Sequence, residues 1–320
     1  MFEKRKRLPP SLKEIFPFSS RYLTLPDGEW MHYIDEGSGP LLVLVHGNPT
    51  WSFLFRHLIA YFRRTHRVIA MDHVGMGLSS RPRKYSYNLR QHSRNLKTLL
   101  SFVGVGNEIK TFSMLVHDWG CPIGLGAAMD LSASQDLSLI EQLFITNSAS
   151  FRSKNIPSRI NLLKGRLGSF AITRMNLFAK MALFMAPAKK LHPKIKEALL
   201  FPYQTPRDRI GIDHFVQDIP LTTDDESYSS LKRIEDKLKT LKTTPAIIWG
   251  MKDFCFDKTF LDTWIKIYPE AKVFELHEAS HYLFEDAAKE IIESMLQIIN
   301  SNVISIKTNL ESDEISLHSQ

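Results

Sequence analysis

The sequence predicts an α/β protein in which a mostly parallel sheet, flanked by helices, carries an inserted block of helices. Short apolar runs alternate with segments of helical spacing in residues 20–147, and the alternation resumes in residues 234–300. Strands that alternate with helices form parallel sheets with helical crossovers. Residues 148–233 show amphipathic helical patterns and no convincing strand. We therefore expect a two-part core with a helical cap over the carboxyl ends of its strands, where such folds bind ligands.

The elements of the core follow from apolar spacing and turn signals. Arg21 to Glu36 is typical of a hairpin, because two alternating runs flank the turn residues Pro26-Asp27-Gly28. Continuous apolar runs predict buried strands, and a spacing of 3.6 residues predicts helices. The other predicted strands are Leu41–Val45, Arg67–Asp72, Met114–Val116, Ile140–Thr146, Ala246–Gly250 and Lys272–Leu276. The predicted helices are Trp51–Arg63, Tyr87–Val103, Ile160–Met185, Pro193–Phe201 and Asp286–Asn300.

The chain ends and the composition give no indication of a secreted, membrane-spanning or disulfide-rich protein. Residues 1–19 form a predicted N-terminal extension without the apolar stretch of a signal peptide, and the polar residues 301–320 are expected to be disordered. No apolar run reaches the length of a membrane span. Two cysteines, Cys121 and Cys255, do not indicate a disulfide framework, and we expect a cytoplasmic protein. Gly75-x-Gly77 lacks the third glycine of a dinucleotide loop, and we expect neither a cofactor nor a metal ion.

The net charge of +7 is concentrated in one segment. Residues 151–209 hold 13 basic and two acidic residues, a balance of +11, whereas the remaining 28 basic and 32 acidic residues give −4. A solvated basic face, a membrane surface, an acidic protein partner or an anionic substrate group would each account for this charge. The chain has no aromatic–basic motif for nucleic acid, and we expect no nucleic-acid partner.

The chemistry centres on KTFSMLVHDWGCPIGLGAAM, residues 110–129. An apolar run leads into a tight turn at Asp118, and a helix of small residues follows, with Pro122 in its first turn. This pattern is typical of a nucleophile elbow, in which the turn holds the nucleophile above the sheet, here with Asp118 where a serine usually stands. Taken alone, Asp118 fits a helix N-cap as well, but its companions favour the nucleophile.

Two companions of Asp118 follow later strands, in the chain order nucleophile, acid, histidine. Asp253 and His281 each come directly after a predicted strand. A dry pocket with fixed N–H donors makes a carboxylate a competent nucleophile, and His281, oriented by Asp253, can then activate water or carry a proton. Asn147 ends another strand, but it is an amide, which leaves Asp253 as the predicted acid. We expect His117 to be structural and to point away from the site.

Asn48 and Trp119 are the candidate anion-stabilising residues. Trp119 follows the nucleophile, so its backbone N–H should face the oxyanion position and its indole N–H should reach into the pocket. Asn48 can donate its side-chain amide from the opposite wall. Two such donors suit a halide or a carboxylate as the leaving group. The predicted pocket-lining residues, for which core packing is an equal alternative, are Trp51, Phe254 and Phe256.

These motifs carry a resemblance to a known family. VHGNPTWSFLFR, DHVGMGLSSRP and LVHDWG resemble the haloalkane dehalogenase group of α/β-hydrolases, over residues 21–299. Within it, YIDEGSGP, RDRIGIDHFVQDIPL, WGMKDFCFDKTFLDTW and ASHYLFEDA are similar to the β-lactone decarboxylases of long-chain olefin biosynthesis. The resemblance implies the α/β-hydrolase fold and an aspartate nucleophile. The implied roles are Asp118 as nucleophile, His281 and Asp253 as its partners, Asn48 and Trp119 as anion holders, and Arg209 as a polar cap group near the site.

The sequence therefore predicts an enzyme that converts a dialkyl β-lactone, a small hydrophobic and long-chain substrate, to a cis-alkene and carbon dioxide. The apolar, basic cap suits two alkyl chains and a developing carboxylate. Haloalkane dehalogenation through an alkyl-aspartate ester is the alternative, since the same residues serve both reactions. An epoxide hydrolase would need two cap tyrosines, for which the inserted block offers Tyr203 and Tyr228. A non-catalytic lipid-binding protein of the same fold is the last alternative.

Overall fold

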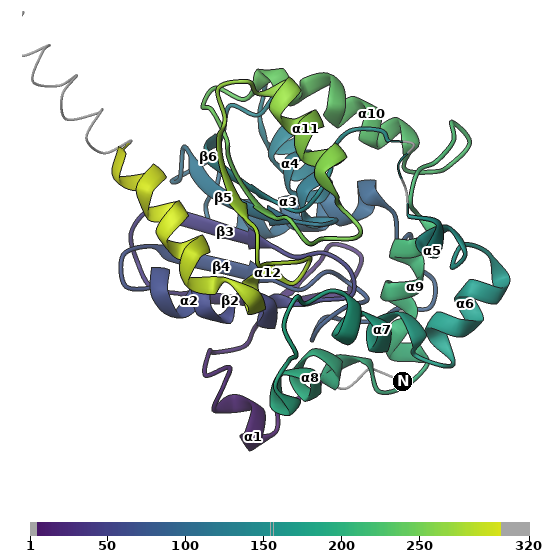
Figure 1. Ribbon diagram of the computed structural model, residues 1–320. Coiled ribbons are helices and arrows are strands. Elements are labelled where there is room, and N and C mark those ends of the chain that lie inside the picture. The colour runs from purple at the N-terminus through teal and green to yellow at the C-terminus, as the bar shows by residue number, and fades with distance from the viewer. Residues whose placement is uncertain (1–4, 154, 156, 302–320) are drawn as a thin grey trace, which may run out of the picture.

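The computed structural model describes residues 5–153, 155 and 157–301, and an eight-stranded sheet lies at its centre (Figure 1). The strands are β1 (Arg21–Thr24), β2 (Trp30–Glu36), β3 (Leu41–Val45), β4 (Arg67–Met71), β5 (Phe112–His117), β6 (Ile140–Thr146), β7 (Ala246–Gly250) and β8 (Lys272–Leu276). Their order is β1-β2-β4-β3-β5-β6-β7-β8. The β1–β2 and β2–β4 pairs are antiparallel and the other pairs are parallel, which confirms the predicted hairpin and mostly parallel sheet.

Helices cover both faces of this sheet. The helices of the core are α1 (Pro10–Lys13), α2 (Arg56–Phe62), α3 (Leu89–Phe102), α4 (Gly120–Leu131), α11 (Lys258–Ile267), α12 (Leu283–Asp286) and helical residues 288–301. The helix α10 (Tyr228–Lys237) crosses the predicted end of the inserted block at residue 233 and packs on the core. Short 3-10 helices are η1 (Ser52–Phe55), η2 (Phe201–Tyr203), η3 (Arg207–Arg209) and η4 (Leu238–Thr240). The helices α3, α4 and α10 pack together on one face, and α2 with helical residues 288–301 lies on the other (Figure 1). Every residue of β3 and β7 is buried, as expected of parallel strands covered on both sides.

The inserted block forms a helical layer beside the sheet (Figure 1). Its helices are α5 (Ser158–Asn161), α6 (Arg166–Thr173), α7 (Leu177–Met185), α8 (Pro193–Leu200) and α9 (Ile210–Gln217). The prediction of one helix over residues 160–185 is wrong, because the chain breaks at Gly165 and Asn176, whose φ angles are 86° and 57°. A residue in this left-handed region cannot continue a right-handed helix.

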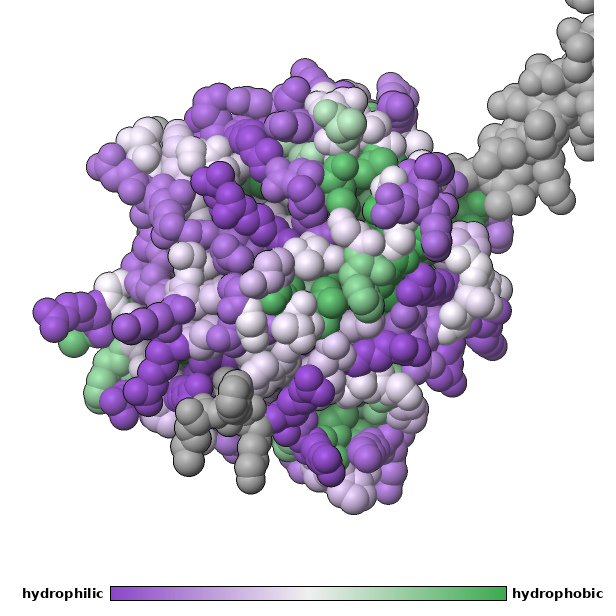
Figure 2. All heavy atoms as spheres, turned by 180° about the vertical axis from the view of Figure 1, so that it is seen from behind, coloured by the Kyte–Doolittle hydropathy of each residue, from purple (hydrophilic) through white to green (hydrophobic). Residues whose placement is uncertain are grey.

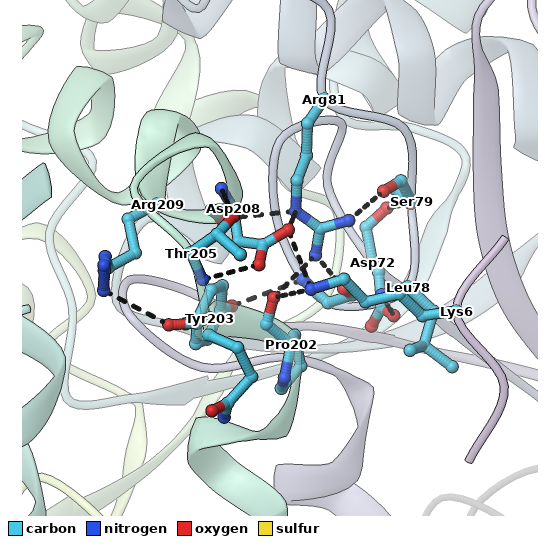
Figure 3. A network of polar contacts seen from close by, with 12 residues as sticks. Lys6, Asp72, Leu78, Ser79, Arg81, Pro202, Tyr203, Thr205, Asp208 and Arg209 are labelled. Carbon is cyan, nitrogen blue, oxygen red and sulfur yellow. Dashed lines mark hydrogen bonds and ion pairs between the residues drawn. The ribbon is translucent and has the colours of Figure 1, made fainter. Parts of the chain in front are cut away.

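A buried polar network fastens the inserted block to the core (Figure 3). Arg81, in the loop after β4, is 2% exposed and donates to the backbone oxygens of Asp208 (3.2 Å), Ser79 (2.7 Å) and Gly77. The Asp208 carboxylate accepts from Nζ of Lys6 at 2.7 Å, so the N-terminal extension joins the same network. Three segments far apart in the sequence therefore share one set of hydrogen bonds, which fixes the position of η3 and α9 over the sheet.

The two ends of the chain differ in how they meet the fold. Leu8, Leu12, Phe16 and Phe18 are buried, so the described part of the N-terminal extension packs on the core. Of the tail predicted to be disordered, residue 301 is helical and residues 302–320 lie outside the described residues. Within the described part of the chain, no helix has the length and apolar character needed to cross a membrane.

Asp218, which follows α9, is expected to make folding depend on pH. Its Oδ2 accepts from the backbone N–H of Leu89 (2.9 Å) and from the hydroxyl of Ser227 (2.6 Å), and burial raises the pKa of the carboxyl to about 7. An acid whose folded pKa exceeds its unfolded value contributes stability at low pH, and that contribution is lost as the pH rises through the folded pKa. Asp218→Asn keeps the acceptor and cannot ionise. Because the folded pKa lies about 3 units above the unfolded value, we expect the variant to gain about 3–4 kcal/mol over the wild type between about pH 4 and pH 8.

Urea unfolding of both proteins at the two pH values measures this change. Asp224→Asn, in the neighbouring loop, is the matched control and should give the same difference from wild type at both. A stability difference between Asp218→Asn and the wild type that stays constant with pH would contradict the assignment.

Candidate active site

Asp118 stands at a strained turn between β5 and α4. Its φ of 52° is left-handed, and the turn is held by the hydrogen bond from its backbone N–H to the oxygen of Asn147 (3.1 Å). Gly120 makes the tight turn possible, because a Cβ there would lie 2.1 Å from the backbone oxygen of Val45. A non-glycine residue is kept in this conformation only where its surroundings enforce it, which is typical of functional sites.

One carboxylate oxygen of Asp118 is fixed and the other is free to react. Oδ1 accepts from the backbone N–H of Asn48 (2.8 Å) and from that of Trp119 (2.6 Å). Oδ2 lies 3.8 Å from Nε2 of His281. The two backbone donors orient the carboxylate so that Oδ2 faces the histidine, which is the geometry of a positioned nucleophile.

His281 is oriented by Asp253 on the side away from Asp118. Nδ1 of His281 lies 2.8 Å from Oδ2 of Asp253, and Oδ1 of Asp253 accepts from the backbone N–H groups of Cys255 (2.6 Å) and Phe256 (3.1 Å). The structure therefore brings together the three residues that the sequence placed after β5, β7 and β8. A carboxylate on Nδ1 leaves Nε2 to exchange protons with a water or a substrate beside Asp118.

Burial and charge shift the pKa values of this set. Burial raises the pKa of Asp118, while the nearby imidazole of His281 and the two N–H donors oppose the rise. Burial alone would lower the pKa of His281, but the carboxylates of Asp253 and Asp118 outweigh it, so the pKa of His281 is raised. His281 therefore holds its proton more firmly than a solvated histidine, beside a carboxylate that has lost its hydration shell.

Asn147 braces both sides of the site. Its backbone oxygen accepts from Asp118, and its side chain bonds both backbone groups of Gly250 at the end of β7, Nδ2 to the oxygen (3.0 Å) and Oδ1 from the nitrogen (2.7 Å). From the sequence, position 147 was only an alternative place for the acid. Its bracing role could have been predicted from the presence of an amide side chain, which can donate and accept at once, directly after a central strand.

The catalytic set opens into a cavity of about 470 Å³. Its lining is largely apolar, with contributions from the loops after β3, β5, β6 and β7 and from α7. Asp118, His281 and Asn48 are among the few polar residues on its wall. A cavity of this size with convergent polar groups at one end is typical of a site for a hydrophobic ligand.

Some of the predicted site residues line this cavity, but one of them uses a different group from the one expected. Asn48 lines the cavity, but its Nδ2 donates to the backbone oxygen of Ile212 (3.1 Å), and it is its backbone N–H that reaches Asp118. The expectation that its side-chain amide donates into the pocket is therefore corrected. Trp119 lines the cavity and gives its backbone N–H to Asp118, as described above. Phe254 and Phe256 also lie on the cavity wall.

Trp51, Arg209 and His117 lie elsewhere than expected. The Trp51 indole is buried and donates to the backbone oxygen of Ala198 (3.2 Å), so it joins the core to α8 and does not line the cavity. Nε of Arg209 donates to the backbone oxygen of Thr173 (2.9 Å), which makes Arg209 a link between η3 and α6. Figure 3 shows its second contact, to the backbone oxygen of Tyr203 (3.5 Å). His117 does not point away from the site, since its ring centroid lies 4.7 Å from that of His281.

Gly47, which the sequence analysis did not single out, is required by the approach of β3 to the elbow. A Cβ at this position would lie 2.0 Å from Oδ1 of Asp118. Gly47→Ala is therefore expected to displace the Asp118 carboxylate from its two donors and to lower kcat about 100-fold, as misplacement of a reacting group by about 1 Å does. Steady-state kinetics measure the loss. Gly28→Ala is the control: nothing lies within 4 Å of the added Cβ, and the strain at its φ of 86° should lower stability without changing kcat. Full activity in Gly47→Ala would show that the elbow tolerates the methyl group.

Comparison with known proteins identifies the family. The family model described as "Alpha/beta hydrolase family" matches residues 42–294. The chain belongs to the alpha/beta hydrolase family. It is an enzyme, as its relatives are. This α/β-hydrolase is 33% identical over 301 residues to a cis-3-alkyl-4-alkyloxetan-2-one decarboxylase of Xanthomonas campestris, covering 90% of this chain and 98% of the relative.

Two further relatives show the range of the similarity. The decarboxylase of the same name from Shewanella oneidensis is 35% identical, with 88% of each chain covered. Haloalkane dehalogenase 2 of Mycobacterium bovis is 27% identical, covering 89% of this chain and 96% of the relative. The crystal structure of haloalkane dehalogenase DbeA from Bradyrhizobium elkanii superposes with a TM-score of 0.78 at 20% identity, over 90% of this α/β-hydrolase and 99% of that chain, and supports the same fold.

Proposed function

We propose that this α/β-hydrolase decarboxylates a 3,4-dialkyl β-lactone to a cis-alkene and carbon dioxide. The observation that carries the proposal is the position of Asp118, an oriented carboxylate with one free oxygen at the end of a large apolar cavity. The two relatives above 30% identity, which are named as decarboxylases of this substrate class, support it. The cavity suits two alkyl chains, and the lactone ring would lie against Asp118 and His281.

The reaction can be written with Asp118 as a nucleophile that is regenerated. Oδ2 attacks the alkyl-bearing ring carbon that is bonded to the ring oxygen, this bond between carbon and ring oxygen breaks, and the former lactone carbonyl becomes a carboxylate on the neighbouring carbon. The bond to this carboxylate then breaks, its electron pair forms the alkene, and the ester bond to Asp118 breaks. Inversion in the first step and anti elimination in the second convert a cis-lactone into a cis-alkene. No water or proton is consumed.

The surrounding residues fit this sequence of steps. The positively charged form of His281, favoured by its raised pKa, lies 3.8 Å from Oδ2 and would stabilise the carboxylate that develops when the ring opens. The N–H groups of Asn48 and Trp119 would keep Asp118 in place as an ester and as a leaving group. The apolar lining lowers the access of water, which would otherwise hydrolyse the ester.

Haloalkane dehalogenation is the second candidate, because the same three side chains can hydrolyse an alkyl-aspartate ester. Oδ2 of Asp118 would displace a halide, and a water activated by His281 would cleave the ester. The relative from Mycobacterium bovis named as a dehalogenase supports this candidate at lower identity. The epoxide hydrolase alternative has less support, because Tyr203 is fully buried with its hydroxyl on the backbone oxygen of Thr50, and neither it nor Tyr228 lines the cavity.

Product analysis in ¹⁸O-labelled water separates the candidates. The purified full chain is incubated with a cis-3,4-dialkyl β-lactone and, separately, with a bromoalkane, and alkene, hydroxy acid and bromide are quantified. We expect cis-alkene from the lactone and no ¹⁸O-labelled hydroxy acid. Labelled hydroxy acid or unreacted lactone would refute the decarboxylation. Bromide release together with unreacted lactone would assign the site to dehalogenation.

A further inference from the structure

The outer side of the inserted block exposes large apolar side chains next to the cavity. Leu167 is 88% exposed, Leu162 79% and Phe184 69%. Soluble monomers rarely expose a contiguous set of such residues without a binding role. The set that α6, α7 and the turn before them present is here called the apolar rim, and it consists of Leu162, Leu167, Phe170, Leu177, Met181 and Phe184.

Apart from Lys180, the helix α7 is apolar on both of its sides. Ala179 and Leu183 are buried against the protein, while Leu177, Met181 and Phe184, at a spacing of four and three residues, are exposed. A helix that is apolar all round is normally covered on every side, by protein or by lipid. In the described structure the protein packs against only one side of α7. The apolar side chains on its outer side therefore remain exposed.

The charges carried by the segment that presents the apolar rim have one sign. Residues 158–190 contain seven lysines and arginines and no acidic residue. Arg166, Arg174 and Lys180 are exposed on or beside α6 and α7, among the rim residues. Figure 2 shows apolar atoms beside hydrophilic ones at the left edge of the reverse face, the side on which α6 lies. Apolar residues flanked by cations are the composition of helices that lie in the interface of an anionic membrane.

The apolar rim is continuous with the active-site cavity. Leu162, Leu177 and Met181 are exposed and also line the cavity that ends at Asp118 and His281. An apolar molecule could therefore pass from a surface in contact with the rim to the nucleophile along an apolar path. A bilayer accounts for this continuity better than a protein partner, because it would be both the surface that covers the rim and a reservoir of apolar substrate.

We propose that the apolar rim and its cations dock this α/β-hydrolase on an anionic lipid bilayer, with the mouth of the cavity facing the membrane. Docking rests on the surface of the inserted block and not on the proposed reaction, so it holds for either substrate. Exposed leucine and phenylalanine side chains would enter the acyl boundary, and Arg166, Arg174 and Lys180 would contact anionic headgroups. The depth of insertion is that of an interfacial helix and needs no membrane-spanning segment.

Vesicle flotation of the purified full chain tests this inference without any measurement of turnover. We expect the protein to float with vesicles of phosphatidylcholine and phosphatidylglycerol, and weakly or not at all with phosphatidylcholine alone. The variant Arg166→Gln/Arg174→Gln/Lys180→Gln should bind about 100-fold more weakly, because each cation contributes roughly fivefold to partitioning. The variant Leu167→Ser/Phe170→Ser/Phe184→Ser should also lose binding. Neither set includes a cavity-lining residue, so circular dichroism and turnover of a water-soluble short-chain substrate should be unchanged.

Matched controls lie at the opposite end of the sheet. Lys110→Gln/Lys239→Gln/Lys242→Gln removes the same charge from exposed positions before β5 and β7, and Phe102→Ser removes an exposed phenylalanine from the end of α3. Both controls should float like the wild type. A wild type that stays unbound with anionic vesicles, or controls that lose as much binding as the rim variants, would overturn the proposal. Binding to polyglutamate without flotation would also overturn it, in favour of an acidic protein partner.

Discussion

Asp118→Asn is expected to lower kcat/KM about 10⁴-fold or more for every substrate of this α/β-hydrolase, since loss of a covalent nucleophile has effects of this size. The amide oxygen of the variant can still accept from the N–H groups of Asn48 and Trp119, so the elbow should keep its shape. The amide cannot supply the electron pair that forms the ester. Alkene formation from a β-lactone and bromide release from a bromoalkane measure the loss, and intact-protein mass spectrometry should detect no covalent adduct.

The matched control for this variant is Asp257→Asn. Asp257 is an exposed N-cap of α11, its Oδ1 accepts from Thr259 at 2.9 Å, and asparagine serves equally well in that role. This variant should have wild-type kinetics. If Asp118→Asn kept more than about a tenth of the wild-type rate, the ester mechanism would have to be abandoned for both candidate reactions.

Arg81→Met is expected to reduce the free energy of unfolding by about 3–5 kcal/mol, the range measured when one partner of a buried ion pair is removed. Arg81 is almost fully buried, and its guanidinium donates to four backbone oxygens, of Gly77, Ser79, Pro202 and Asp208. Methionine fills much of the same volume but removes the Arg81 hydrogen bonds to these oxygens and one of the cations beside the Asp208 carboxylate, where Lys6 remains. Urea denaturation followed by circular dichroism measures the change.

Arg83→Met is the control for this effect, because Arg83 is exposed only two residues away. A surface substitution of this kind should alter stability by less than about 0.5 kcal/mol. A second variant, Asp208→Asn, keeps the shape of the network and removes its charge, and it should cost less than Arg81→Met. A loss below about 1 kcal/mol in Arg81→Met would show that the inserted block is held to the core by its apolar contacts instead.

The sequence predicted those parts of the fold that depend on local pattern. The apolar runs at 41–45 and 246–250 coincide with β3 and β7, because parallel strands covered on both faces are apolar throughout. The strand predicted at 140–146, whose apolar centre is residues 143–145, coincides with β6. The meeting of Asp118, Asp253 and His281 followed from topology alone. Side chains placed just after parallel strands must gather at the same edge of the sheet.

Features that depend on packing between distant segments were not predictable in this way. Arg209 donates to the backbone oxygen of Thr173, and Trp51 donates to that of Ala198. No sequence pattern predicts that the two residues of either pair lie side by side. The use of the Asn48 backbone, and not its side chain, depends on how closely the loop after β3 approaches the elbow. The break at Asn176 was missed because asparagine is compatible both with a helix interior and with a left-handed turn.

The hydrogen bonds of Asn147 affect how Asp118 and Asp253 are held relative to one another. Its backbone oxygen holds Asp118 and its side-chain amide holds the end of β7, after which Asp253 follows, so one residue is hydrogen-bonded to both segments that carry the two carboxylates. A displacement of either strand end would stretch hydrogen bonds of Asn147. An aspartate at position 147 could still accept from the backbone N–H of Gly250 but could not donate to its oxygen, so the brace needs an amide and the acid that orients the imidazole comes from another strand.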